Sequence, residues 1–286
     1  MKITEIIKGK KPSLSFEVFP PKTWDRFESV LKAATDIAGI NPSYMSVTYG
    51  AGGGTSDYTA AICNELGRRG ITALAHLTCV SSDKERIKDE LTRLKAQGTE
   101  NVLALRGDIP AGADISKIHY RHASELIGEI VRFGGFCIGG ACYPEGHPES
   151  ANAATDIEGL KIKVESGCEF LTTQMFFDNN ILYNFLYRLM RAGVNVPVVA
   201  GVMPVTAAAQ IKRLCAISSS ALPQRFIRIV DRYGDNPAAM KQAGIAYATE
   251  QIIDLFANGI NAVHVYSMNK PDVARAIKQN LSEILS

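Results

Sequence analysis

The sequence lacks the patterns that would place it outside the ordinary globular proteins. Its charges nearly cancel, with 31 Lys and Arg against 29 Asp and Glu, and the basic residues do not cluster into a surface suited to nucleic acid. No apolar run is long enough to cross a membrane. Residues 1–11 mix charges with isoleucine and contain no signal-peptide core. We therefore expect a cytoplasmic protein with neither a nucleic-acid nor a membrane partner.

Metal-binding patterns are also missing. The six cysteines form no Cys-x-x-Cys pair, and no group of Cys and His has zinc spacing. Isolated cysteines of this kind are typical of a reduced compartment, where they pack as small buried side chains. We predict no metal site and no catalytic cysteine.

The chain does contain eight short apolar runs that alternate with stretches of helical spacing. Runs of this length, rich in Val, Ile, Phe and Tyr, are typical of strands buried on both faces. Strands that alternate with helices form parallel sheets, and eight such units predict one α/β domain over residues 1–286, a (β/α)8 TIM barrel. The predicted strands are Leu14–Phe19, Tyr44–Tyr49, Ala73–Val80, Val102–Arg106, Phe136–Tyr143, Phe170–Phe177, Val198–Met203 and Val263–Met268.

Start and stop signals mark helices after most of these strands. The connections Asp108–Arg121 and Leu222–Asn236 are longer than a simple barrel needs, and loops of this length often cover a ligand. The predicted helices are Thr23–Ala38, Ser56–Arg69, Ser82–Gln97, Ser124–Phe133, Asp156–Ser166, Asn180–Arg191, Ala207–Ala216 and Pro237–Asn258.

Polar residues gather at the carboxyl ends of the predicted strands, where barrel enzymes have their active sites. Glu17 lies inside the first strand, and burial there would raise its pKa to a value useful for a general acid. A structural carboxylate is the competing interpretation. Arg106 could neutralise a phosphate or simply pair with Asp108. The glycine-rich segment after Tyr49 matches no standard phosphate-binding motif.

Other polar residues at these ends have an ordinary structural interpretation as well. His76 alone is more often a core histidine, and Gln174 could bind a heterocycle edge or a neighbouring strand. His264, Tyr266 and Asn269 we interpret as packing residues of the last strand.

Six motifs taken together resemble the bacterial methylenetetrahydrofolate reductases, from about Ser13 to the C-terminus. They are Ser-Phe-Glu-Val-Phe-Pro-Pro-Lys (15–22), Ser-Val-Thr-Tyr-Gly-Ala (46–51), His-Leu-Thr-Cys (76–79), Leu-Ala-Leu-Arg-Gly-Asp (103–108), Ala-Cys-Tyr-Pro-Glu-Gly-His-Pro-Glu (141–149) and Thr-Gln-Met-Phe-Phe-Asp (173–178). The resemblance implies a flavin-dependent oxidoreductase that reduces 5,10-methylenetetrahydrofolate to 5-methyltetrahydrofolate, a step that supplies methyl groups for methionine synthesis. It implies FAD as cofactor, NADH or NADPH as co-substrate in a ping-pong cycle, and a homo-oligomer.

The same resemblance implies individual roles. Glu17 would be the acid that protonates the folate, and Asp108 would stabilise the resulting cation beside the flavin. Gln174, Gln210 and Lys270 would contact substrate together with Asp108. The implied FAD-binding residues are Thr48, Tyr49, Ala51, His76, Arg106, Gly107, Asp108, Ala123, Tyr143, His147, Asp156 and Lys163.

The chain departs from the family pattern at several positions. Leu214 stands where Phe is expected, His122 where Tyr is usual, and Ile162 replaces a basic residue. Lys270 stands where Arg is usual and cannot make its bidentate contact. Because Leu214 would weaken nicotinamide stacking, an electron-transfer partner protein is an alternative donor.

Two further classes of function are less well supported by the sequence. A Schiff-base aldolase needs an inward lysine, and the predicted strands contain none. A non-catalytic binding module would have little need for a buried Glu17 together with Asp108. The length of the chain leaves no room for the regulatory domain of eukaryotic relatives, so we expect none here.

Overall fold

Eight parallel strands close into a barrel in which each strand pairs with its neighbours in the sequence, and β8 returns to β1. The computed structural model describes residues 1–49, 56–109, 118–211 and 222–286. The strands are β1 (Ser13–Val18), β2 (Met45–Val47), β3 (Ala73–Thr78), β4 (Asn101–Leu105), β5 (Cys137–Cys142), β6 (Phe170–Thr173), β7 (Val198–Val202) and β8 (Ala262–Tyr266). The predicted TIM barrel is confirmed.

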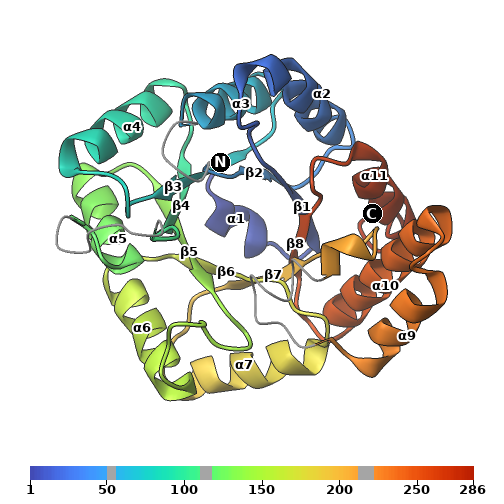
Figure 1. The fold of residues 1–286 in the computed structure, drawn as a ribbon. Coiled ribbons are helices and arrows are strands. Elements are labelled where there is room, and N and C mark those ends of the chain that lie inside the picture. The colour runs from blue at the N-terminus through green and yellow to red at the C-terminus, as the bar shows by residue number, and fades with distance from the viewer. Residues whose placement is uncertain (50–55, 110–117, 212–221) are drawn as a thin grey trace.

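Helices surround this ring of strands, except the first helix of the chain, which lies within the ring in this view (Figure 1). In the described part of the chain they are α1 (Ile3–Ile7), η1 (Trp24–Arg26), α2 (Phe27–Ala38), α3 (Ser56–Arg68), α4 (Lys84–Ala96), α5 (Ala123–Phe133), α6 (Ala153–Glu165), α7 (Asn179–Arg191), α9 (Gln224–Tyr233), α10 (Pro237–Ala257) and α11 (Pro271–Asn280). No helix among these residues is long and apolar enough to span a membrane.

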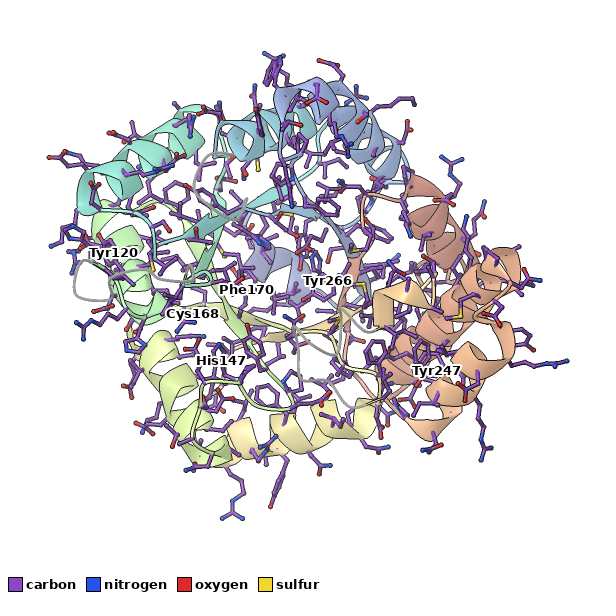
Figure 2. All side chains as sticks on the ribbon, in the orientation of Figure 1. Tyr120, His147, Cys168, Phe170, Tyr247 and Tyr266 are labelled. Atoms are coloured by element: carbon purple, nitrogen blue, oxygen red, sulfur yellow. The ribbon has the colours of Figure 1, made fainter. Side chains whose placement is uncertain are left out.

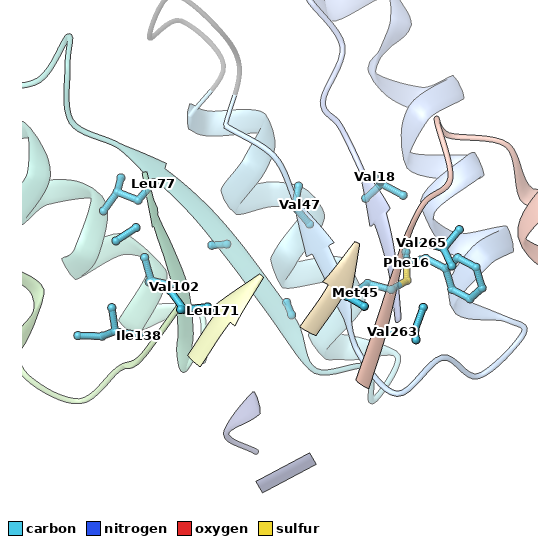
Figure 3. Packing of buried hydrophobic residues seen from close by; sticks show 14 of the residues in the cluster. Phe16, Val18, Met45, Val47, Leu77, Val102, Ile138, Leu171, Val263 and Val265 are labelled. Carbon is cyan, nitrogen blue, oxygen red and sulfur yellow. The ribbon is translucent and has the colours of Figure 1, made fainter. Parts of the chain in front are cut away.

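Alternation along the strands divides the barrel into an outer and an inner set of side chains. In β1, Phe16 and Val18 point outward and pack with Val263 and Val265 of the neighbouring β8 under the surrounding helices (Figure 3). Tyr266 and Phe170 lie inside the ring, whereas Tyr247 lies among the outer helices (Figure 2). The outer layer is the main hydrophobic core, so the inner layer is available for polar groups.

Helix α1 closes the amino-terminal end of the barrel. Its Ile3 and Ile7 pack against inner residues near the strand starts, including Leu74 and Phe170. Asn101 at the start of β4 holds the helix in place, because its Oδ1 accepts a hydrogen bond from the Ile3 backbone N–H at 2.8 Å. The barrel is therefore filled by apolar side chains at this end.

Two expectations are corrected, one about a segment outside the barrel and one about where the strands end. The segment Leu222–Asn236, expected as a covering loop, contains α9, whose Phe226 is buried against Phe177 and Tyr247. All eight strands also end earlier than predicted. The largest difference is in β6, which stops at Thr173, although the Gln174 backbone N–H still donates to the Cys142 carbonyl.

The cysteines fit the prediction made for them. Those in the described residues are buried and free, and burial raises the pKa of the Cys63 and Cys168 thiols to about 12. A thiol with so high a pKa is protonated at neutral pH and is a poor nucleophile. No cluster of His, Cys, Asp and Glu in the described part of the chain could hold a metal ion.

Candidate active site at the carboxyl end of the barrel

A cavity of about 1380 Å³ opens at the carboxyl ends of the strands and reaches down the barrel axis as far as Leu74 and Leu103. This volume exceeds the 300–1,000 Å³ of typical small-molecule sites, so it has room for two ligands or one long one. Most of the residues expected to bind ligands line it. They are Glu17, Thr48, Tyr49, His76, Arg106, Gly107, Asp108, Ala123, Tyr143, His147, Asp156, Lys163, Gln174 and Gln210.

One described residue that was expected to bind substrate, Lys270, is not among the residues that line the cavity. Lys270 follows β8 and donates from Nζ to the Thr206 hydroxyl at 2.7 Å. Ala51 lies outside the described residues, as does Leu214. Of the other departures from the family pattern, His122 and Ile162 both line the cavity.

Glu17 faces the cavity from β1, where its side chain is 18% exposed. Burial raises the pKa of its carboxyl from an ordinary value of 4.5 to about 8. The group facing it is His76 of β3, whose Nε2 lies 3.7 Å from Glu17 Oε2. Burial lowers the pKa of His76 to about 3, so this histidine is neutral and does not offset the cost of ionising Glu17. The carboxyl is protonated at neutral pH.

His264 of β8 provides a useful contrast with His76. Its Nδ1 lies 2.7 Å from the Ser15 hydroxyl and its Nε2 lies 2.9 Å from the Ser46 hydroxyl. Its ring also stacks on Tyr44. His264 is thus held by its neighbours, as a packing residue is, although it also lines the cavity. Tyr266 lines the cavity too, with its hydroxyl donating to the Thr173 carbonyl.

Three lining side chains have buried polar atoms without a hydrogen-bond partner among the described residues. They are the Tyr49 hydroxyl, His76 Nε2 and the Thr172 hydroxyl. An unpaired buried polar group costs about 1–3 kcal/mol. Such atoms are suited to a ligand that has nitrogen and oxygen atoms at its edge. Sequence reasoning missed Thr172, although its two-residue spacing from the cavity-lining Gln174 places both on the inner face.

Positive charge lies on one side of the cavity. Arg106, at the end of β4, forms a bidentate ion pair with Glu149 at 2.5 and 2.6 Å. Its partner is thus Glu149 and not Asp108, which is exposed at the rim. Lys163 of α6 reaches inward and donates from Nζ to the Ala141 carbonyl at 2.7 Å, and burial lowers its pKa.

The loop between β5 and α6 is held in a fixed shape beside these cations. His147 packs edge-on against Tyr143 with 4.6 Å between ring centroids, and its Nδ1 accepts from the Glu149 backbone N–H at 3.2 Å. Asp156 accepts a hydrogen bond from the Ser150 hydroxyl. The loop is therefore preorganised by its own side chains.

The two glutamines expected to contact substrate are engaged locally. Gln174 Oε1 accepts from the Met175 backbone N–H at 2.9 Å. Gln210 Oε1 accepts from the backbone N–H groups of Thr206 and Ala207 at 3.0 and 3.1 Å. Each carbonyl oxygen is thus fixed by backbone, which orients the amide group of the same side chain.

Fold and cavity together define a TIM-barrel protein with a large cavity at the carboxyl ends of its strands, where barrel enzymes have their active sites. The amino-acid sequence narrows this class to one family. The chain belongs to the methylenetetrahydrofolate reductase family, whose model matches residues 2–282.

Curated relatives support this assignment. The 5,10-methylenetetrahydrofolate reductases of Pectobacterium carotovorum and Escherichia coli are each 30% identical over 94% of this chain and 90% of their own length. Methylenetetrahydrofolate reductase (NADH) 1 of Arabidopsis thaliana is 32% identical over 99% of this chain. The chain spans about half the length of the plant relatives it matches.

Solved structures show the same fold at low identity. An uncharacterised protein from Clostridium thermocellum, described as binding two copies of 5-methyl-5,6,7,8-tetrahydrofolic acid, superposes with a TM-score of 0.68 at 13% identity over 99% of both chains. A tryptophan synthase chain from M. tuberculosis superposes with a TM-score of 0.53, also at 13% identity, over 96% of this chain and 94% of that one. These likenesses concern the barrel fold.

Proposed function

We propose that this protein reduces 5,10-methylenetetrahydrofolate to 5-methyltetrahydrofolate, with bound FAD as the hydride carrier and NADH or NADPH as the donor. The family membership supports the reaction, and the named activity of the bacterial relatives supports the substrate. The observation that carries the proposal is Glu17, a carboxyl in β1 that faces a large cavity and whose pKa burial raises to about 8.

The residues present fit a flavin dinucleotide. The buried polar atoms of Tyr49, His76 and Thr172 can pair with the edge of a heterocycle. Arg106 and Lys163 supply positive charge suited to a pyrophosphate. The loop of residues 143–150, held by its own hydrogen bonds, would form a rigid side of the flavin site. When bound, FAD would accept a hydride from the nicotinamide and pass it to the folate.

Glu17 would supply the proton that the net reaction consumes. Its carboxyl gives a proton to N10 of the folate, the bond from N10 to the bridging carbon breaks, and the hydride forms the new C–H bond at that carbon. The methyl group remains on N5, and Glu17 regains a proton from solvent. Asp108 at the rim would favour the positive charge that develops on the folate, and Gln174, Gln210 and Lys270 would orient the substrate.

An anaerobic visible spectrum tests this proposal. FAD-loaded protein should bleach with NADH or NADPH, and methylenetetrahydrofolate should restore the oxidised spectrum. In Glu17→Gln, bleaching should persist while restoration slows by 10²-fold or more, as expected for loss of a general acid. Restoration after chemical reduction, without bleaching by either nicotinamide, would indicate a protein electron donor. A protein that binds no flavin would contradict the proposal.

A further inference from the structure

The turn that follows β8 has an unusual backbone. Met268 and Asn269 are consecutive residues in the left-handed region, with φ of 54° and 53°. In the described residues, Asn41 at φ 55° is the one other non-glycine residue with positive φ. Asparagine tolerates this conformation, whereas a long side chain such as Met is disfavoured there. Strain of this kind persists only where surrounding contacts enforce it, and it clusters at functional sites.

Three side-chain hydrogen bonds join this turn to the exit of β1, beside the bond within the turn from the Lys270 backbone N–H to the Ser267 carbonyl. Asn269 Oδ1 accepts from the Phe19 backbone N–H at 3.0 Å, and Asn269 Nδ2 donates to the Phe19 carbonyl at 2.9 Å. The Ser267 hydroxyl donates to the Glu17 carbonyl at 2.6 Å. Ser267 is 1% exposed, so this last bond is protected from water. We call residues 267–269 the β8 clasp.

The β8 clasp acts where the strand pairing of Glu17 ends. Glu17 pairs with Tyr266 on one side and Ser46 on the other, and the strand stops one residue later. A side chain this close to a strand end would move with the fraying backbone. The amide of Asn269 replaces the missing ladder by hydrogen-bonding both polar groups of Phe19, two residues beyond Glu17. The same turn places Met268 in the cavity wall.

We propose that Asn269 is a positioning residue that fixes the Glu17 carboxyl for proton transfer by holding the exit of β1. This inference rests on the proposed function, in which Glu17 is the acid. It predicts that loss of the amide harms the folate step, because that step needs the proton of Glu17. Flavin reduction by the nicotinamide does not use that proton and should be spared.

Asn269→Gly is the main test, because glycine accepts the left-handed backbone and removes only the two bonds to Phe19. We expect flavin reoxidation by methylenetetrahydrofolate to slow at least tenfold, with flavin reduction by NADH and the dissociation constant for FAD within twofold of wild type. Asn269→Asp keeps the acceptor oxygen but loses the donor, so its rate of flavin reoxidation should lie between those of wild type and Asn269→Gly. The matched control is Asn41→Gly, an exposed left-handed position at the other end of the barrel, which should behave as wild type.

The outcomes separate the two proposals. Wild-type reoxidation in Asn269→Gly, or an equal loss in both half-reactions, would overturn the positioning role. If Asn269→Gly does not fold, Ser267→Ala takes its place: it removes the bond to the Glu17 carbonyl, and reoxidation should slow about threefold or more with flavin reduction unchanged. An unaffected folate step in Ser267→Ala would then overturn the role. Wild-type reoxidation in Glu17→Gln would instead reject the acid assignment itself, whatever Asn269 does.

Discussion

Single residues in the barrel interior differ mainly in whether their polar atoms are paired. His264 is bonded through both ring nitrogens, so its burial costs little and it completes the core. His76 Nε2 has no hydrogen-bond partner among the described residues, and burial favours the neutral form of Glu17, which lies 3.7 Å from it. Unpaired groups that face a cavity are better explained by a ligand than by packing.

The raised pKa of Glu17 has a measurable consequence for the stability of the fold. The pKa of the carboxyl is about 8 in the folded protein and near 4.5 when exposed. Between these values the folded state binds more protons than the unfolded state, so stability falls as pH rises from 4.5 through 8. Glutamine does not titrate. Glu17→Gln should therefore become more stable relative to wild type as pH rises, by an amount on the order of a few kcal/mol above pH 8.

Urea denaturation of both proteins at pH 5 and pH 8.5, without added flavin, measures this difference. The buried histidines are common to both proteins, so their own pH dependence largely cancels in the comparison. A stability difference that does not change between the two pH values would show that Glu17 ionises normally in the fold.

At the scale of elements, the strands were predictable because each is a short apolar run bounded by loops. The small elements were not. Helix α1 has five residues, too few for a periodic pattern, and packs through long-range contacts with strand starts. Phe226, Val230 and Tyr233 of α9 have helical spacing, but the segment Leu222–Asn236 was judged by its length and expected to be a loop.

The partners of site residues were less predictable than the site itself. Sequence order places Arg106 next to Asp108, yet the β5–α6 loop brings Glu149 to it from 43 residues away. Asn269, interpreted as a packing residue of the last strand, lies past the strand end and hydrogen-bonds Phe19. The first contact depends on the pairing of β4 with β5, and the second on the closure of the barrel between β8 and β1; no local pattern reveals either. The acidic Glu17 within a buried strand, in contrast, was visible at once.

The turn at the end of β4 offers a test at this scale. Gly107 has φ +85°, and a Cβ there would lie 3.1 Å from Val80 Cγ1 and 3.2 Å from Thr78 Cβ, both on the exit of β3. Gly98 has φ +77° with open space around it. Gly98→Ala should cost about 1–2 kcal/mol from its backbone alone. Gly107→Ala should cost a further ~1–3 kcal/mol from overpacking.

Chemical denaturation of the two variants measures the difference, and FAD titration gives a second readout. Because Gly107 also lines the cavity, its variant should bind FAD more weakly than wild type, while Gly98→Ala should bind it normally. Equal stability losses in the two variants would show that the β3 exit yields easily and that the turn is not tightly packed.

At the scale of the whole molecule, the two ends of the barrel have separate tasks. The amino-terminal end is closed by α1 over an apolar layer, and the carboxyl end opens into the polar cavity. Leu74 and Leu103 belong to both regions, since they pack near α1 and form the floor of the cavity. Ile3 and Ile7 of α1 do not line the cavity, so substitutions there should change stability without altering the residues that face it.

Ile3→Ala tests this separation. Ile3 is fully buried in the closing layer, and replacing it leaves a hole that should lower the free energy of unfolding by about 2–5 kcal/mol. Ile253→Ala, on the solvent-facing side of α10 with 40% exposure, should change it by less than about 0.5 kcal/mol. Well below the melting temperature, both variants should keep the FAD affinity and the two half-reaction rates of wild type. A loss of FAD binding in Ile3→Ala at full folding would mean that the floor formed by Leu74 and Leu103 transmits the packing of α1 to the cavity, and that the two ends of the barrel are coupled.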